Sequence, residues 1–143
     1  MDIKEKWISL LQESGCRITS PRAAIIDAIL TSQRGLEPLE LFDLVRKSHP
    51  GIGLVTVYRT LDRLENLGLI QRVHQENGCH MVMKAAVGHE HYLLCTSCGR
   101  AVLFDGDDLS RLVSRVESSS GYKVSDHWLQ LFGLCPSCQP VNG

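Results

Sequence analysis

Four cysteines in the second half of the chain have the type and spacing that most directly indicate chemistry. They form two Cys-x-x-Cys pairs, Cys95 with Cys98 and Cys135 with Cys138. The two-residue gap lets both sulfurs of a pair face one ion, and closed structural zinc sites use four tetrahedral ligands that are often all thiolates. The two pairs supply that full set, so the sequence predicts a structural Zn²⁺ site.

Two enzyme interpretations of these cysteines conflict with their surroundings. A dithiol redox site needs a helix after its first cysteine, whose positive end lowers the pKa of the thiol, and residues 139–143 do not predict one. A zinc nucleoside deaminase needs His-x-Glu and Pro-Cys-x-x-Cys, whereas here His89 directly precedes Glu90 and the proline lies inside the second pair. Four thiolates also leave no open metal position for catalysis. We therefore expect no enzyme and no small-molecule substrate.

Two histidines just before the first cysteine pair are candidate ligands of another ion. His89 and His91 alternate along an expected strand, which places both side chains on one side, as two ligands of one ion require. The sequence therefore predicts a second divalent metal site in this region.

Composition limits the kind of protein that carries these sites. The chain has 143 residues, 43% of them hydrophobic, and a net charge of −1, which fits one or two small globular domains. No apolar run approaches the roughly 18 residues of a membrane span, and residues 1–15 lack the features of a signal peptide. We expect a cytoplasmic protein, in which six cysteines indicate metal or redox chemistry rather than disulfides. If it binds DNA, its basic residues must gather on one surface.

The first half predicts helices followed by a hairpin. Apolar residues recur at helical spacing in segments 3–13, 20–30, 39–45 and 54–67, and Ser20 with Pro21 gives a helix start at which Ser20 caps. Gly68 is placed to end the fourth helix. Strands at 69–73 and 79–83 flank a turn at 76–78. This order is that of a winged helix-turn-helix over residues 1–83; the alternative is another compact helical domain, which could show the same periods.

The second half predicts a smaller mixed domain. Residues 84–88 suggest a hinge, and residues 89–143 a separate domain with strands at 92–95 and 100–104. A helix over 107–119 would turn its apolar residues inward, namely Leu109, Leu112, Val113 and Val116. A strand-like run over 123–134 leads into the second cysteine pair. The fold class is therefore α+β.

Several of these segments together resemble the ferric uptake regulator family. The matching stretches are GCRITSPR at 15–22, VTVYRTL at 55–61, GLI at 68–70, HEH at 89–91 ahead of the first cysteine pair, and His127 and Gly133 ahead of the second pair. The resemblance covers about residues 7 to 138. It implies a winged-helix DNA-binding domain, a hinge, a small α/β dimerisation domain, and repression when a regulatory metal is bound.

The resemblance also implies how DNA would be bound. The helix with Thr56, Tyr58 and Arg59 would enter the major groove, where Arg can bind guanine or phosphate and Tyr can contact a thymine methyl. Arg17 and Arg22 match family positions that approach DNA. A homodimer would bind double-stranded DNA at a palindromic operator.

The regulatory metal site departs from the family pattern. Gly35-Leu36, Met83 and Leu103 stand where the family often has a histidine, an acidic residue and a carboxylate. One alignment places His89, His91 and His127 in the family site of the dimerisation domain, with Ser110 as the fourth position and Asp107 one turn earlier on the same helix face. A one-residue shift places the two histidines in the hinge site instead. That alternative adds weaker candidates, which are Cys79, His80, His74 and Glu90.

These observations lead to one principal hypothesis for function. The protein is expected to be a metal-responsive DNA-binding repressor of metal uptake or homeostasis genes, with structural Zn²⁺ and a regulatory Fe²⁺, Zn²⁺ or Mn²⁺. The regulatory ion would fix two winged helices at the spacing of successive major grooves. The alternatives are a peroxide sensor and a metal-insensitive member of the family that keeps only the structural zinc.

Overall fold

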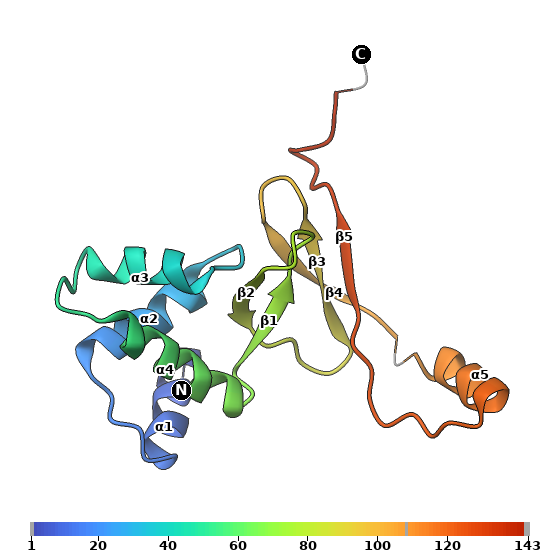
Figure 1. Cartoon of the computed structure of the whole chain (residues 1–143), viewed down its shortest axis with the longest axis horizontal. Helices are drawn as coiled ribbons and strands as arrows, with labels where there is room; N and C mark the ends of the chain where they lie inside the picture. The colour runs from blue at the N-terminus through green and yellow to red at the C-terminus, as the bar shows by residue number, and fades with distance from the viewer. Residues whose placement is uncertain (1, 108, 142–143) are drawn as a thin grey trace. The chain divides into compact units, whose positions relative to one another are not determined.

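The computed structural model describes residues 2–107 and 109–141 of the chain (Figure 1). It forms two compact units whose boundary lies between Ala85 and Ala86, inside the segment that the sequence suggests as a hinge. No described helix has both the length and the apolar character that a membrane crossing requires.

The first unit consists of four helices followed by a two-stranded hairpin. Its elements are α1 (Ile3–Glu13), α2 (Ser20–Thr31), α3 (Pro38–Arg46), α4 (Leu54–Asn66), β1 (Ile70–His74) and β2 (His80–Lys84). The helices meet in one apolar core, whose fully buried side chains include Leu11, Ile25, Ile26, Leu41, Val57 and Leu64. These are the apolar positions of the helical periods, so the pattern that predicts the helices also builds their core.

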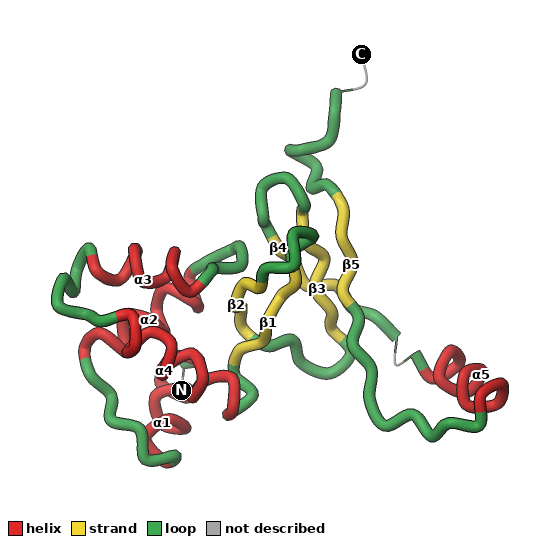
Figure 2. Tube along the Cα trace, viewed as in Figure 1, coloured by secondary structure: helices red, strands yellow, loops and turns green. Residues whose placement is uncertain are grey.

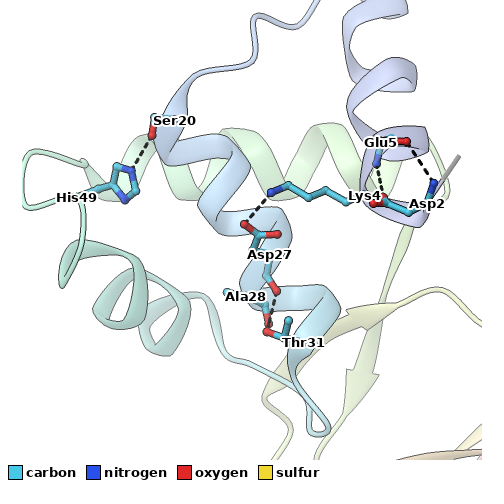
Figure 3. Close-up of polar contacts among 8 residues, drawn as sticks. All are labelled: Asp2, Lys4, Glu5, Ser20, Asp27, Ala28, Thr31 and His49. Atoms are coloured by element: carbon cyan, nitrogen blue, oxygen red, sulfur yellow. Dashed lines mark hydrogen bonds and ion pairs between the residues drawn. The ribbon is translucent and has the colours of Figure 1, made fainter.

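Local caps and a few polar contacts set where the first helices begin and how they meet (Figure 3). The Asp2 carboxylate accepts the Glu5 N–H at 2.9 Å and caps α1. Thr19 caps α2, because its hydroxyl accepts the Arg22 N–H. The expectation that Ser20 is the cap is wrong; Ser20 is the first helical residue, and Thr19 is the residue with the extended backbone that a cap needs.

The hairpin, which we call the wing (residues 70–84), is also joined through its backbone to the segment between α2 and α3. β1 and β2 pair antiparallel from Ile70 opposite Lys84 to His74 opposite His80. Leu36, between α2 and α3, exchanges backbone hydrogen bonds with Val82 of β2 at 3.2 and 2.8 Å. Both residues are buried, so the inner face of the wing completes the helical core.

The described part of the second unit contains a three-stranded sheet and one helix, which Figure 2 shows in yellow and red. Its elements are β3 (Glu90–Cys95), β4 (Ala101–Asp105), α5 (Ser110–Ser120) and β5 (Gln130–Gly133). β3 is the central strand, antiparallel to β4 and parallel to β5. The strand expected over 123–134 is confined to its last part, which is the part that pairs with β3.

Helix α5 differs from its expectation in both its start and its packing. It begins at Ser110 rather than at residue 107, and Leu109 precedes it with a left-handed backbone at φ 56°. None of its residues is buried; Leu112 is 48% and Val116 42% exposed. The expected inward apolar face is therefore present as a stripe, but within one subunit it has no surface to cover it.

Candidate metal centre and nucleic-acid interface

The strand pairing of the second unit brings the two cysteine pairs together. Cys95 is the last residue of β3 and lies opposite Gly133 at the end of β5. Because the two strands run parallel, the turns that follow them leave the sheet at the same edge. One ligand atom from each of the four cysteines lies within 4.8 Å of the others.

The spacing of the sulfurs fits one zinc ion. The sulfurs of Cys98 and Cys135 are 3.8 Å apart. Tetrahedral zinc with bonds of about 2.3 Å separates its thiolate sulfurs by about 3.8 Å. Soft thiolate donors in this number select zinc over harder divalent ions, so the donor set and the geometry agree on structural Zn²⁺.

Backbone amides prepare one of these thiols to bind a cation. The Cys95 sulfur accepts the N–H groups of Cys135 at 3.4 Å and Cys98 at 3.5 Å. These hydrogen bonds lower the Cys95 pKa from 9.0 to about 6. At the other end of the cluster, the hydrogen bond with Cys135 raises the Cys138 pKa to about 12. Without a cation the group therefore holds a thiolate and a thiol side by side.

A second candidate ligand group centres on His91. This side chain is buried, and its Nε2 has no hydrogen-bond partner among the described residues. The ring of His127 lies with its centre 6.0 Å from that of His91. Gly106 lies against the same ring, since a Cβ on it would stand 2.7 Å from the His91 Cδ2. A buried imidazole nitrogen without a partner is costly, and a metal ion would satisfy it.

The other expected ligands of this site lie less favourably. His89 is exposed in the turn before β3, and its carbonyl accepts the Gly106 N–H. The Glu90 carboxylate accepts the Val87 N–H. Asp107 lies outside α5, where its carboxylate accepts the Leu109 N–H at 2.9 Å, so the expectation that it shares a helix face with Ser110 is wrong. Among described residues, only the four cysteines form a group of three or more potential ligands.

The candidates for the hinge alternative lie on the wing, in the first unit. Cys79 and His80 are exposed, and the rings of His74 and His80 have centres 4.2 Å apart. Leu36 is only 3% and Met83 8% exposed. Both positions where the family often has ligands are thus occupied by apolar side chains that belong to the core.

Basic residues gather on one face of the first unit. A surface hollow is lined by Arg22 of α2 and, from α4, by Arg59, Asp62, Arg63 and Asn66. Arg22 is held there by a 2.7 Å hydrogen bond from its Nη1 to the Arg17 carbonyl. Arg63 and Asn66 are not among the DNA contacts that the sequence predicts. The signal for Arg63 is its position one helical turn after Arg59, on the same face.

Exposed residues at the start of α4 extend this surface. Tyr58 is 45% exposed and Arg59 is exposed, whereas Thr56 is half-buried. Val55, 61% exposed, adds an apolar contact surface that is not among the contacts predicted from the sequence. Arg17 is exposed before α2. A helix with cations, a phenol and a methyl-bearing side chain on one face can contact both phosphates and base edges.

Comparison with known proteins identifies the family of this chain. The model of the ferric uptake regulator family matches residues 13–132. This chain belongs to the ferric uptake regulator family. A ferric uptake regulation protein of Legionella pneumophila is 31% identical over 131 residues, covering 90% of this chain and 96% of the relative.

Solved structures show the same fold. The ferric uptake regulator of Helicobacter pylori, described as having three functional metal binding sites, has a TM-score of 0.74 at 20% identity, covering 99% of this chain and 97% of that one. The Francisella tularensis regulator with iron has a TM-score of 0.68 at 27% identity, covering 87% and 95%. The α+β fold class, with an N-terminal winged helix and a C-terminal dimerisation domain, is thereby confirmed. Members of this family are dimeric, DNA-binding transcription regulators that respond to metals.

Proposed function

We propose that this protein is a metal-dependent repressor whose first unit binds a palindromic operator and whose second unit pairs two subunits and senses a divalent ion. The family supports the metal-responsive, DNA-binding role. The observation that carries the sensing role is the buried His91 Nε2, which has no partner among the described residues. We further propose a cytoplasmic location and no enzymatic activity.

The four cysteines are proposed to hold a structural zinc ion. Such an ion supplies folding free energy rather than reactivity, because four protein ligands leave no position open. Cys95 ends β3 and Cys98 lies in the turn after it, while Cys135 and Cys138 follow β5. The cluster therefore fixes the two turns at one edge of the sheet and keeps β5 in register with β3.

His91 and His127 are proposed to hold the regulatory ion, with His89 as a further ligand. A bound divalent cation would supply a positive charge that satisfies the imidazole nitrogens. His91 lies on the central strand, and His127 lies in the segment between α5 and β5. Joining them would tie that segment, and α5 before it, to the sheet. Imidazole donors suit Fe²⁺ and Zn²⁺, whereas Mn²⁺ prefers oxygen donors.

The DNA contacts are proposed for α4 and the start of α2. Tyr58 and Arg59 would contact base edges, and Arg17, Arg22 and Arg63 would contact phosphates. In a dimer the two copies of α4 would enter successive major grooves. The ion that orders the second unit would then shift the population of dimer conformations towards those in which the two α4 helices have the spacing that the operator requires.

Fluorescence anisotropy with an operator duplex tests this proposal. Fe²⁺, Zn²⁺ and Mn²⁺ are added one at a time to full-length protein that keeps its cysteine-bound zinc. We expect at least one ion to tighten binding, and His91→Gln to abolish that effect while leaving the cysteine-bound zinc in place. His49→Gln, a histidine outside both sites, is the matched control. Operator binding that is unchanged by every ion would contradict the sensing role.

A second candidate function is a family member that binds DNA with structural zinc alone. Leu36 and Met83 in the apolar core favour it, as does Ser110 where a fourth ligand is expected. Metal content separates the two candidates. The sensor loses one ion per subunit in His91→Gln, whereas the metal-insensitive regulator holds the same number of ions in both forms.

A further inference from the structure

The wing carries a pair of imidazoles that neither the cysteine cluster nor the proposed sensor site uses. His74 ends β1 and His80 begins β2, and the two are directly opposite each other in the antiparallel pairing. Their ring centres are 4.2 Å apart, with the ring planes tilted by 57°. Directly opposite side chains on an antiparallel pair stand on the same face. The two rings therefore share one side of the hairpin.

We propose that His74 and His80 form a separate binding site for a borderline divalent cation, with Cu²⁺ and Zn²⁺ preferred. Imidazole nitrogens bind zinc at about 2.0–2.1 Å, so two of them on one tetrahedral ion stand about 3.3 Å apart. Two rings whose centres are already 4.2 Å apart reach this separation by small side-chain rotations. Nitrogen donors favour Cu²⁺ and Zn²⁺ over Mn²⁺.

The turn beside the pair is already formed without an ion. The Gln75 N–H donates to the Cys79 carbonyl at 2.9 Å, and the Gly78 N–H donates to the Gln75 carbonyl at 3.0 Å. The Cys79 N–H donates to the Asn77 side chain at 2.9 Å. These bonds fix the ends of both strands, so an ion would meet two donors whose backbone is preorganised.

The location of the two histidines determines how an ion reaches them and how a bound ion would affect the hairpin. His80 is exposed and His74 half-buried, so an ion can enter from solvent and keep water on its remaining positions. His74 and His80 are the last pair in register before the turn. An ion bound by both residues would link β1 to β2 and stabilise their pairing next to the turn.

Equilibrium dialysis of full-length protein against Zn²⁺, with its cysteine-bound zinc in place, tests the site. We expect His74→Gln and His80→Gln each to lose the same single ion per subunit, and the double variant to lose no more. Each single variant should raise the Kd for that ion by about tenfold or more. His49→Gln removes a histidine elsewhere on the first unit and should bind as the unchanged protein does.

Nitrogen-detected NMR of the imidazoles gives an independent measurement on the same samples. Zn²⁺ should shift the ring resonances of His74 and His80 together in the unchanged protein, and neither in the double variant. Unchanged ring resonances, or an ion count that survives the double variant, would show that the rings only pack against each other and would overturn the proposal.

The same experiment separates this site from the proposed sensor site. His91→Gln should remove a different ion, so a variant that combines His74→Gln with His91→Gln should lose two. If the sensor proposal is wrong, His91→Gln keeps its full ion count while His74→Gln still loses one. If the wing proposal is wrong, His74→Gln keeps its full ion count while His91→Gln still loses one ion.

Discussion

At the scale of single residues, the four cysteines are not equivalent. Backbone N–H groups lower the Cys95 pKa to about 6, while the Cys138 pKa is raised to about 12. The hydrogen bonds therefore favour the thiolate form of Cys95, which is the form that binds zinc. The remaining thiols lose their protons as the ion binds them.

This asymmetry predicts how acid removes zinc. Protons compete with zinc for Cys138 well above pH 6, because its pKa is about 12, and below the Cys95 pKa of about 6 they compete for Cys95 as well. The zinc affinity, measured as transfer to a chromogenic chelator, should therefore fall more steeply with pH below pH 6 than above it. Release is followed by the absorbance of the chelator complex. Cys16→Ser, which changes a buried cysteine of the other unit, should behave as the unchanged protein does. A zinc affinity that falls with the same slope above and below pH 6 would contradict the prediction.

Gly106 leaves the space that the ring of the candidate ligand His91 occupies. A Cβ there would stand 2.7 Å from the His91 Cδ2 and 3.1 Å from its Nε2. Gly106→Ala should therefore push the ring out of place, reduce the free energy of unfolding by about 1–3 kcal/mol, and weaken metal-dependent operator binding. Denaturant unfolding and anisotropy measure the two effects.

Gly51→Ala is the matched control for this change. Nothing lies within 4 Å of a Cβ at Gly51, and its backbone is not left-handed. It should leave operator binding unaffected. If Gly106→Ala behaves in the same way as Gly51→Ala, then the His91 ring has room to move and is not fixed by its neighbours.

At the scale of elements, the buried apolar residues and the exposed basic residues of α4 lie on different faces of the helix. Val57, Leu61 and Leu64 are buried, whereas Arg59 and Arg63 line the hollow with Arg22. The core therefore sets the direction in which the arginines point. Because they follow each other by one turn, they can contact one groove edge together.

Arg63 should accordingly act as a DNA contact. Arg63→Ala is expected to weaken operator binding and to reduce the slope of log affinity against log salt by about 1, as the loss of one phosphate contact does. Arg46→Ala is the control, since Arg46 forms an exposed ion pair with Asp43 on α3. A salt slope that stays the same in Arg63→Ala would place this residue outside the interface.

The sequence predicts elements well where the signal is local. Helical periods, Gly68 after α4 and the Cys-x-x-Cys spacing depend on neighbours in the chain, and the four helices, the wing and the sulfur cluster follow from them. The errors concern contacts that the sequence does not show. Thr19 and Ser20 are equally suitable caps by residue type, so only the backbone distinguishes them. The extent of β5 depends on how far β3 reaches beside it.

Functional residues show the same limit. The His-x-His spacing indicates His89 and His91, but only the structure separates them, since His91 is buried while His89 is exposed. Asp107 fails as a helix-face ligand because α5 begins three residues later, and the Asp107 carboxylate binds the Leu109 N–H instead. Arg63 joins Arg22 only through the packing of α2 against α4.

At the scale of the whole molecule, α5 indicates that one subunit is incomplete. It has no buried residue, and its apolar positions Leu112 and Val116 are about half exposed. An isolated amphipathic helix of this length is marginal in water. Since members of the family are dimers, we expect the partner subunit to cover this stripe.

Thermal unfolding should therefore depend on protein concentration. Dilution should lower the Tm, because dissociation accompanies unfolding. Leu112→Asp together with Val116→Asp should shift the protein towards monomer in analytical ultracentrifugation and weaken operator binding. Arg111→Asp is a control on the same helix, since its side chain is exposed without contributing to the stripe. A Tm that is independent of concentration would indicate that each subunit folds alone.

The uncovered stripe of α5 also makes the regulator sensitive to its own abundance. If the paired form is the one that represses, its amount in dilute conditions follows the square of the number of chains, and halving synthesis lowers it by about fourfold. Transcription would then respond more steeply than linearly to the dosage of this gene, without any interaction between neighbouring operators.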